Sequence, residues 1–229
     1  MRKEIIKAGN VCVYTYSFEL MDSRMYMIRE EDEMLVVDPC EDDALLKDAE
    51  GVQRVVVLLT HEHFDHISGV NWLKNHFNCQ VYSGSVCARR VESAKENLSS
   101  RFAFLFILDK EKYNYVRRNI SLPYTCKVDK CFNGSGTVTW RSHTIEIREV
   151  GGHSPGSCLL LLDRKILFAG DNVLGNGREL WDTKAKEQEY SERVLQFLDQ
   201  LDENIYVLPG HGDGNILHFF LDKLPCGSI

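Results

Sequence analysis

The sequence predicts an α/β fold in which two β-sheets pack face to face and carry helices on their outer surfaces, a four-layer α/β/β/α sandwich. Three observations predict it. Each half of the 229-residue chain contains a series of short segments rich in β-branched and aromatic residues. Helical patterns follow strands in both halves, and residues 54–59 form a continuous apolar run, typical of a strand covered on both faces. The hydrophobic content of 44% suits a single domain spanning residues 1–229.

The first elements are expected to be consecutive antiparallel strands, because short apolar and aromatic runs alternate with turn-prone or charged residues. These strands are expected at residues 4–9, 10–18, 24–31 and 33–38. A short helix is expected at residues 41–52, which combine helical apolar spacing with an acidic start and a glycine near the end. The run at 54–59, a helix at 68–77 and a strand at 79–84 then complete a β-α-β unit.

The second half of the chain repeats this style without repeating the sequence. Strands are expected at residues 137–142, 143–150, 157–163 and 165–171, with a hairpin turn at 163–165. Long helices are expected at 185–201 and at the C-terminus. Between the halves, residues 85–135 are less regular and predict a helical insertion. Its parts are a helical pattern at 85–102, an apolar run at 102–108 and an aromatic-rich stretch at 112–118.

The charge of the chain is unevenly distributed. The net charge of −7 argues against general nucleic-acid binding, which needs a basic surface. Between Arg89 and Lys130, however, ten Lys or Arg outnumber five Asp or Glu, so this segment carries +5 and the remainder −12. The N-terminus lacks an apolar leader, and no window reaches the roughly 18 apolar residues of a membrane span. We therefore expect a cytoplasmic protein with no membrane partner.

The eight cysteines are scattered singly along a chain without a secretion signal. Buried free thiols are the expected interpretation. Cys126 and Cys131 are the closest pair, but without a second pair they indicate a zinc ribbon only weakly.

A dense group of potential metal ligands follows the apolar run. The motif THEHFDH places His61, His63, Asp65 and His66 at the expected C-terminal end of a strand, where α/β proteins habitually place their sites. His61 and His63 alternate, so they project to the same side of an extended segment. A single histidine here would be read as a solvated loop residue. The pattern H-x-H-x-D-H instead has the ligand types and density of a hydrolytic zinc site.

Three further potential ligands follow strands in the second half of the chain. His153 lies in GGHSPGS, Asp171 ends FAGD, and His211 lies in VLPGHGDG. Each alone has a structural interpretation, as a turn residue, an Asx-turn or a neighbour of a helix cap. Together with the first cluster they number seven, enough for two metals that share one carboxylate.

At these residues the chain resembles the metallo-β-lactamase-fold hydrolases, specifically the glyoxalase II-like group. The motifs that carry the resemblance run in order from Asp38, at the end of LVVD, to His211, and cover residues 20–212. The resemblance implies two divalent metal ions, zinc in the first place, with iron or manganese as alternatives. It assigns His61, His63 and His153 to one metal and Asp65, His66 and His211 to the other, with Asp171 as the bridge. It also implies that Asp38 orients the ligands.

Two departures from the family pattern narrow the expected activity. Asp171 stands where true β-lactamases generally have a non-bridging Cys or Ser, and no export signal is present, so antibiotic hydrolysis is not expected. Glyoxalase II carries an additional C-terminal helical region that binds glutathione, whereas only 18 residues follow His211. Specific hydrolysis of hydroxyacylglutathione is therefore not expected either.

The expected reaction is hydrolysis of an ester, thioester or lactone. Two cations about 3.5–4 Å apart can hold a bridging hydroxide at neutral pH, which would attack the substrate carbonyl. Asp65 is the candidate catalytic residue, expected to accept or relay a proton. Glu62 is expected to be solvent-facing or structural.

We expect the insertion at residues 85–135 to cap the metals. Its apolar FAFLF stretch and its excess of Lys and Arg favour a small-molecule acyl substrate that carries an anion, steered by Arg117 and Arg118. A basic solvated helix that covers core aromatics explains the insertion equally well.

Three other functions remain compatible with the sequence. An iron-dependent persulfide dioxygenase uses this fold with one metal on two His and one Asp, which would leave His66 and His211 outside the metal's coordination. A phosphodiesterase or nuclease can use the same two-metal centre, although the charge of −7 suits RNA poorly. A non-enzymatic binding module is disfavoured because all seven ligands are present. Oligomeric state leaves no clear signature.

Overall fold

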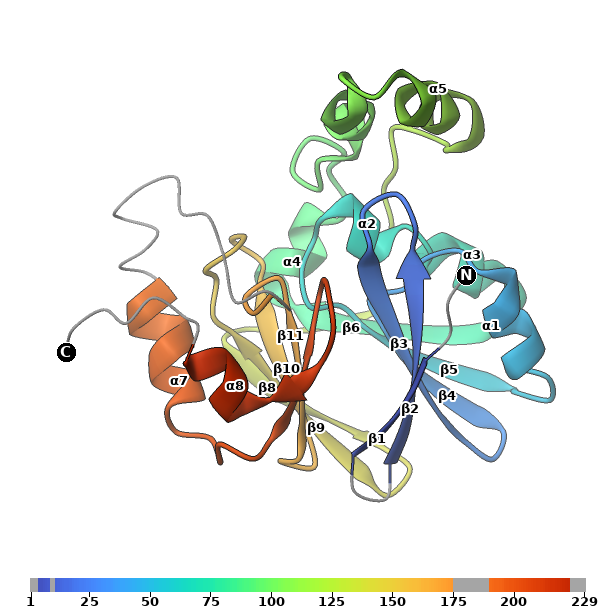
Figure 1. The fold of residues 1–229 in the computed structure, drawn as a ribbon. Coiled ribbons are helices and arrows are strands. Elements are labelled where there is room, and N and C mark those ends of the chain that lie inside the picture. The colour runs from blue at the N-terminus through green and yellow to red at the C-terminus, as the bar shows by residue number, and fades with distance from the viewer. Residues whose placement is uncertain (1–3, 9–10, 175–189, 223–229) are drawn as a thin grey trace.

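The computed structural model describes residues 4–8, 11–174 and 190–222. Two β-sheets pack face to face, and helices cover the outer face of each sheet (Figure 1). The predicted α/β/β/α sandwich is therefore confirmed. In the described part of the chain, no helix combines the length and the apolar character that crossing a bilayer requires.

One sheet has seven strands and contains every described strand of the N-terminal third of the chain. In spatial order they are β1 (Glu4–Ala8), β2 (Val11–Phe18), β3 (Ser23–Glu30), β4 (Glu33–Val37), β5 (Arg54–Leu58), β6 (Asn78–Gly84) and β7 (Lys130–Phe132). The first four form the predicted antiparallel meander, and β4 to β7 are parallel neighbours. β5 is buried at every position after Arg54, as the continuous apolar run predicts. β7 was not predicted, because three residues are too few to show a strand pattern.

The second sheet has six strands from the second half of the chain. In spatial order they are β13 (Asn215–Ile216), β12 (Tyr206–Pro209), β11 (Ile166–Gly170), β10 (Cys158–Leu162), β9 (His143–Glu149) and β8 (Ser135–Trp140). β10 and β11 form the predicted hairpin, and Asp163 and Arg164 in its turn both have positive φ angles, which the tight turns of hairpins favour. β11 and β12 run parallel, so their C-terminal ends lie at the same edge.

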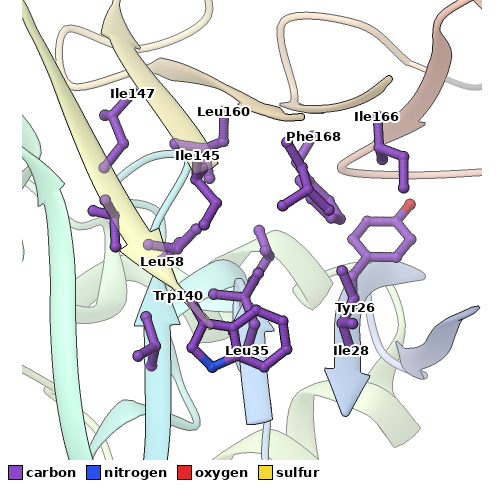
Figure 2. Close-up of a cluster of buried hydrophobic side chains, with 14 of the residues drawn as sticks. Tyr26, Ile28, Leu35, Leu58, Trp140, Ile145, Ile147, Leu160, Ile166 and Phe168 are labelled. Carbon is purple, nitrogen blue, oxygen red and sulfur yellow. The ribbon is translucent and has the colours of Figure 1, made fainter. Parts of the chain in front are cut away.

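Large apolar side chains fill the space between the sheets. Figure 2 shows Leu35 and Leu58 of the seven-stranded sheet in one cluster with Trp140, Ile145 and Leu160 of the six-stranded sheet. None of these five side chains is more than 2% exposed. The alternation of inward and outward residues along each strand places them on the shared face. Burial of this apolar surface is the dominant force holding the two sheets together.

Helices close the sandwich on both outer faces. On the seven-stranded sheet they are α1 (Asp43–Asp48), α3 (Val70–His76) and α4 (Ser85–Arg90). Leu45 of α1 and Leu73 of α3 pack in the cluster that contains Val57 of β5. On the other sheet they are η2 (Ser191–Leu195), α7 (Gln196–Leu198) and α8 (Leu217–Leu221). Val194 and Leu217 pack there in the cluster that contains Val207. Residues 185–189 of the helix predicted at 185–201 lie outside the described residues.

The insertion between β6 and β7 projects beyond the edges of both sheets, at the top of Figure 1. It contains α4, the 3-10 helix η1 (Ser99–Phe106) and α5 (Lys110–Asn119). The predicted helix at 85–102 is wrong after Arg90, because the chain turns to bury Asn97 and passes through a left-handed conformation at Leu98. The Asn97 side chain accepts a hydrogen bond from the Ser99 amide and donates one to the Tyr124 carbonyl. A helix that continued from Arg90 through Asn97 would not permit these two interactions.

Seven of the eight cysteines lie in the described residues, and all seven are free. Burial is found for Cys40, Cys87, Cys126 and Cys158. The prediction of buried thiols is wrong for Cys12 and Cys131, which are exposed; Cys131 lies in the short edge strand β7.

We expect Leu160→Ala to lower the free energy of unfolding by about 2–5 kcal/mol, because it removes buried methyl groups and leaves a cavity between the sheets. Urea unfolding followed by circular dichroism measures the change. Leu108→Ala is the matched control, since Leu108 is fully exposed and its loss should cost less than about 0.5 kcal/mol. Equal effects of the two substitutions would contradict the assignment of this core.

Candidate metal centre

The ends of strands from both sheets bring the seven predicted ligand residues together. In the seven-stranded sheet the chain leaves β5 at Leu58 and reaches His61 three residues later. In the six-stranded sheet Asp171 directly follows β11, and His211 follows β12. His153 lies in the loop between β9 and β10. Because the two sheets pack face to face, side chains that are far apart in sequence converge at one edge of the sandwich.

The short helix α2 (Phe64–Ile67) orients Asp65 and His66, the last two candidate ligands of the motif THEHFDH, which we call the first motif. It begins directly after His63, and the backbone amide of His66 donates to the carbonyl of His63 at 3.0 Å. This turn places Asp65 and His66 next to each other, with 3.4 Å between the His66 Nε2 and an Asp65 oxygen. The change from extended chain to helix therefore separates His61 and His63 from Asp65 and His66.

The first potential metal-binding group contains His61, His63, His153 and Asp171. The Nε2 of His153 lies 3.0 Å from the Nδ1 of His63 and 3.4 Å from the Asp171 Oδ2. The same Asp171 oxygen lies 3.9 Å from the Nε2 of His61. Three imidazole nitrogens and one carboxylate oxygen thus face a common point.

The second potential group contains Asp65, His66 and His211. The Nε2 of His211 lies 3.5 Å from the Asp65 Oδ2 and 3.4 Å from the Nε2 of His66. Asp171 also reaches this group, since its Oδ1 lies 3.3 Å from the Nε2 of His66 and its Oδ2 lies 3.4 Å from the Nε2 of His211. The Asp171 carboxylate therefore lies between the two groups.

Two atoms of the cluster show that its donors suit a cation. The Nε2 of His61 and the Oδ1 of Asp171 are buried, and no hydrogen-bond partner for either lies in the part of the chain that the structure describes. Buried polar atoms without partners are rare, because each one loses its hydration without compensation. Imidazole nitrogens and carboxylate oxygens in this proportion fit zinc, iron or manganese. The residues present therefore fit the predicted metals, while the ligand role of each residue stays a prediction.

Asp38 organises the residues around the cluster. Its carboxylate accepts hydrogen bonds from the Thr60 amide at 2.7 Å and the Thr60 hydroxyl at 2.5 Å. It also accepts from the Nδ1 of His66, at 3.1 Å. The Thr60 hydroxyl, having donated to Asp38, can accept from the Nδ1 of His61 at 3.0 Å. These bonds place a proton on the Nδ1 of both histidines and turn each Nε2 toward the cluster.

His211 is oriented in the same way by the backbone. Its Nδ1 lies 3.0 Å from the carbonyl of Met21, in the β2–β3 hairpin, and donates to it. The amide of His153 donates to the Asn172 side chain at 2.9 Å, which fixes the loop that carries this histidine. Candidate ligand residues from both sheets are thus oriented by hydrogen bonds to atoms that would not themselves bind the metal.

The histidines divide into two classes by pKa. Burial lowers the pKa of His61 well below its ordinary value, and the neighbouring His66 lowers it further. Burial and the proximity of His153 lower the pKa of His63 to about 3. For His66 burial acts in the same direction, but the carboxylates of Asp65 and Asp171 raise its pKa well above the ordinary value. His61 and His63 are therefore neutral near pH 7, and His66 is protonated until a metal displaces its proton.

The pKa values of Asp171 and His211 are shifted by each other and by His66. Burial alone would raise the pKa of Asp171, but His66 and the hydrogen bond with His211 lower it well below the ordinary value. In His211, burial is outweighed by the hydrogen bond with Asp171, and the pKa is raised. The cluster without metal is consequently stabilised by protons at the positions that the second metal would take.

Glycines make room for the ligands at two close approaches. A Cβ atom on Gly210 would lie 2.0 Å from the Oδ1 of Asp171. Gly170 has a positive φ of 52°, and a Cβ there would lie 2.5 Å from the hydroxyl oxygen of Thr60. The strand ends of β11 and β12 can approach the first motif only because these positions lack side chains.

Glu62, in the middle of the first motif, is fully buried. The expectation that it faces solvent is wrong and the structural alternative is correct. Its carboxylate accepts from the Nε of Arg90, in α4, at 2.5 Å and from the hydroxyl of Ser154 at 2.8 Å. Arg90 also donates to the Glu96 carboxylate at 2.9 Å. This network joins the first motif to the base of the insertion and to the loop of His153.

Several of these supporting residues were not identified from the sequence. Thr60 and Ser154 lie next to predicted ligands, so their positions in THEHFDH and GGHSPGS were an available signal. Arg90 lies 28 residues from Glu62 and carries no motif, so no local pattern could have identified it.

A cavity of about 720 Å³ lies beside α2, between the β2–β3 hairpin and the insertion. Phe64, which separates the ligands His63 and Asp65 in sequence, forms part of its wall. Phe102, Phe106 and Val116 of the insertion pack in the same apolar cluster as Phe64. The cavity wall consists of Phe18, Glu19, Leu20, Glu41, Phe64, Ser68, Asn71, Lys112, Tyr115, Asn119, Ile120, Ser121 and Tyr124.

An α/β/β/α sandwich with His and Asp donors at its strand ends is the architecture of a superfamily of metal-binding proteins, and the family match identifies it. The chain belongs to the metallo-beta-lactamase superfamily, whose sequence profile matches residues 20–211. This match spans every residue of the two groups described above.

Individual proteins with similar sequences include hydrolases. A hydroxyacylglutathione hydrolase of Aeromonas hydrophila subsp. hydrophila is 41% identical over 183 residues, which are 78% of this chain but only 58% of that protein. The hydroxyacylglutathione hydrolase GloC of Haemophilus influenzae is 25% identical over 161 residues, 69% of this chain and 68% of that one. Among solved structures, the BLEG-1 B3 metallo-beta-lactamase superposes with a TM-score of 0.70 and full coverage of both chains. Its 21% identity establishes a shared fold and no more.

We expect Asp38→Ala to weaken metal binding by about 10- to 100-fold, because His66 loses its hydrogen bond to Asp38 and the Thr60 hydroxyl, which bonds His61, loses the acceptor that orients it. Competition with a chromogenic chelator measures the affinity. Asp163→Ala is the matched control: its carboxylate contacts the ring of His143, a histidine outside the cluster. A metal affinity in Asp38→Ala equal to that of the control would refute the orienting role.

We expect metal binding near pH 6 to release protons from His66 and His211 and none from His61 and His63, because the first pair has raised pKa values and the second pair lowered ones. Titration calorimetry in two buffers of different ionisation enthalpy counts these protons. His66→Ala should lower the count by about one and His63→Ala should leave it unchanged. An equal fall in both variants would show that the two classes do not exist.

Proposed function

We propose that this chain is a dinuclear metal-dependent hydrolase that cleaves ester and thioester bonds. The observation that carries the proposal is the position of Asp171, whose two oxygens approach His66 on one side and His153 and His211 on others. A carboxylate shared by two groups of nitrogen donors suits a two-metal site, because one negative group can offset the charge of both cations.

In this proposal His61, His63 and His153 hold one cation, Asp65, His66 and His211 hold the other, and Asp171 serves both. Zinc is the first candidate, with iron or manganese as alternatives. When bound, two such cations supply Lewis-acid chemistry, acidifying a water molecule and offsetting the negative charge that develops on a carbonyl oxygen.

The chain's own residues support this chemistry by orientation and proton placement. Asp38 and Thr60 keep the His61 and His66 rings turned toward the cluster. Asp65 is the residue proposed to accept or relay a proton, because its carboxylate lies beside His66 and His211 and retains slight exposure. Burial raises the pKa of Asp65 while His66 lowers it more, so the carboxylate is ionised near neutral pH and can accept a proton.

Thioesters are the substrates that the comparisons favour. Two of the relatives are named hydroxyacylglutathione hydrolases, and a further relative, from Gallus gallus, is named an acyl-coenzyme A thioesterase. The cavity beside Phe64 supports an acyl group of some length, because its wall includes Phe18, Leu20 and Ile120 and its volume is that of a typical small-molecule site. We propose that the acyl group occupies this cavity.

The proposed anionic character of the substrate depends on Lys112. This side chain lines the cavity, whereas Arg117 and Arg118 are exposed on α5 and do not line it. Two carboxylates, Glu19 and Glu41, line the same cavity. An anionic group would therefore have to meet Lys112 at one end, and the steering role expected for the two arginines gains no support.

The persulfide dioxygenase alternative requires a single iron held by two histidines and one aspartate. His66 and His211 would then lie outside the coordination of the metal. The convergence of both residues with Asp65 favours the two-metal proposal. Metal content and oxygen uptake distinguish the two, since the hydrolase consumes no oxygen.

We expect purified protein to contain two metal ions per chain and to cleave thioesters, faster for long apolar acyl groups than for acetyl. Asp171→Asn should lower thioesterase activity by more than about a hundredfold, since losing a shared ligand exceeds the loss of an orienting residue. Mass spectrometry of the metals, a panel of thioesters, lactones and phosphodiesters, and an oxygen electrode test these expectations. His218→Ala, an exposed histidine outside the cluster, is the control. One iron with oxygen uptake, or phosphodiester cleavage alone, would replace the proposed function.

A further inference from the structure

The insertion carries an exposed apolar surface that the proposed function does not use. Phe104, Leu105, Ile107 and Leu108 form this surface, which we call the apolar tip. Their side chains are 59%, 63%, 63% and 101% exposed. Single exposed apolar residues are ordinary, but four within five positions on one protruding segment indicate a surface that binds something.

The apolar tip is held by a well-packed base. In η1 the side chains of Phe102, Ala103 and Phe106 are buried and pack with Phe64 and Val116. The three-residue repeat of a 3-10 helix places Phe104 and Ile107 in one outward row. Asp109 then caps α5 by accepting from the Lys112 amide at 3.0 Å, so the chain turns sharply after Leu108. The exposure of the tip therefore follows from an ordered backbone.

Basic residues outnumber acidic ones in the segment that carries the apolar tip. Residues 98–119 contain five Lys or Arg and two Asp or Glu, a net charge of +3 on a chain whose total is −7. Arg101, Lys110, Arg117 and Arg118 are all exposed. Within the described ranges none of these four side chains takes part in an ion pair. Their charges are thus available to an external partner.

Charge decides which partner fits. A second copy of the chain docking through the same tip would place the basic side chains of one copy against those of the other, which opposes association. An anionic bilayer complements the surface instead, since apolar side chains enter the boundary between headgroups and acyl chains while Lys and Arg attract the headgroups. The insertion also projects beyond both sheets, so its tip can touch a flat surface before the acidic remainder of the chain does (Figure 1).

We propose that the apolar tip and its basic surroundings dock this protein reversibly on membranes containing anionic lipids. The contact is peripheral: the four apolar side chains enter the interface and the backbone of η1 stays outside it. This reverses the expectation of no membrane partner, and it is independent of the reaction catalysed at the metal centre.

The test is flotation of the full-length purified protein with two kinds of vesicle, phosphatidylcholine alone and an equimolar mixture of phosphatidylcholine and phosphatidylserine. We expect binding to the mixed vesicles, little binding to phosphatidylcholine alone, and weaker binding at high salt. The double variant Leu105→Asn/Leu108→Asn and the double variant Arg117→Glu/Arg118→Glu should each lower the affinity more than about tenfold.

Two controls separate docking from unfolding and from general charge. Ile5→Asn removes an exposed apolar side chain from β1, and Arg164→Glu reverses an exposed charge in the β10–β11 turn. Both should bind vesicles as the unchanged protein does. All variants should keep its circular dichroism and its turnover of a short, water-soluble substrate. Failure to bind the mixed vesicles, or equal losses in controls and tip variants, would overturn the proposal. A dimer in sedimentation that Leu105→Asn/Leu108→Asn dissociates would overturn it in favour of a second copy.

Discussion

The buried carboxylate of Asp38 is the interaction on which the site depends. It receives three hydrogen bonds, two from Thr60 and one from His66, and so joins the end of β4 to the end of β5 and to α2. A buried charge with several donors is stable where an unpaired one would not be. The backbone of Asp38 adopts a φ of 51°, a left-handed conformation that residues other than glycine rarely take. The backbone of Asp38 is therefore locally strained, and this conformation allows its carboxylate to orient His66 directly and His61 through Thr60.

The sandwich and the convergence of the seven candidate ligand residues were predictable because each rests on a short-range pattern. Strand periodicity and the continuous run of β5 predict the sheets, and ligand residues that follow strands are expected at a common edge. What the sequence did not predict rests on contacts between distant segments. The burial of Glu62 depends on Arg90, which lies 28 residues away in α4, and the early end of the helix expected at 85–102 depends on where Asn97 finds its hydrogen-bond partners. The three-residue strand β7 exists only because β6 offers it an edge.

The Glu62 network also explains how the insertion is attached. Arg90 lies at the end of α4, where the irregular part of the insertion begins, and its guanidinium bonds the carboxylates of both Glu62 and Glu96. Phe102 packs on Phe64 and Phe106 packs on Phe102, and the Phe64 amide donates to the Asn97 carbonyl, so both polar and apolar contacts tie the insertion to the motif THEHFDH. The insertion is consequently a fixed projection of the sandwich, with a buried base and an exposed end.

The candidate ligand residues come from both sheets, with His61 after β5 and Asp171 and His211 after β11 and β12. A cation bound between them would act as a cross-link between the two halves of the chain. It would bind the native state and not the unfolded one, so its binding free energy would add to the stability of the fold. The lifetime of such a protein in a cell then follows the local metal supply. When the metal is scarce, more molecules would be partly unfolded and exposed to proteases. The amount of protein would then fall together with the activity of each molecule.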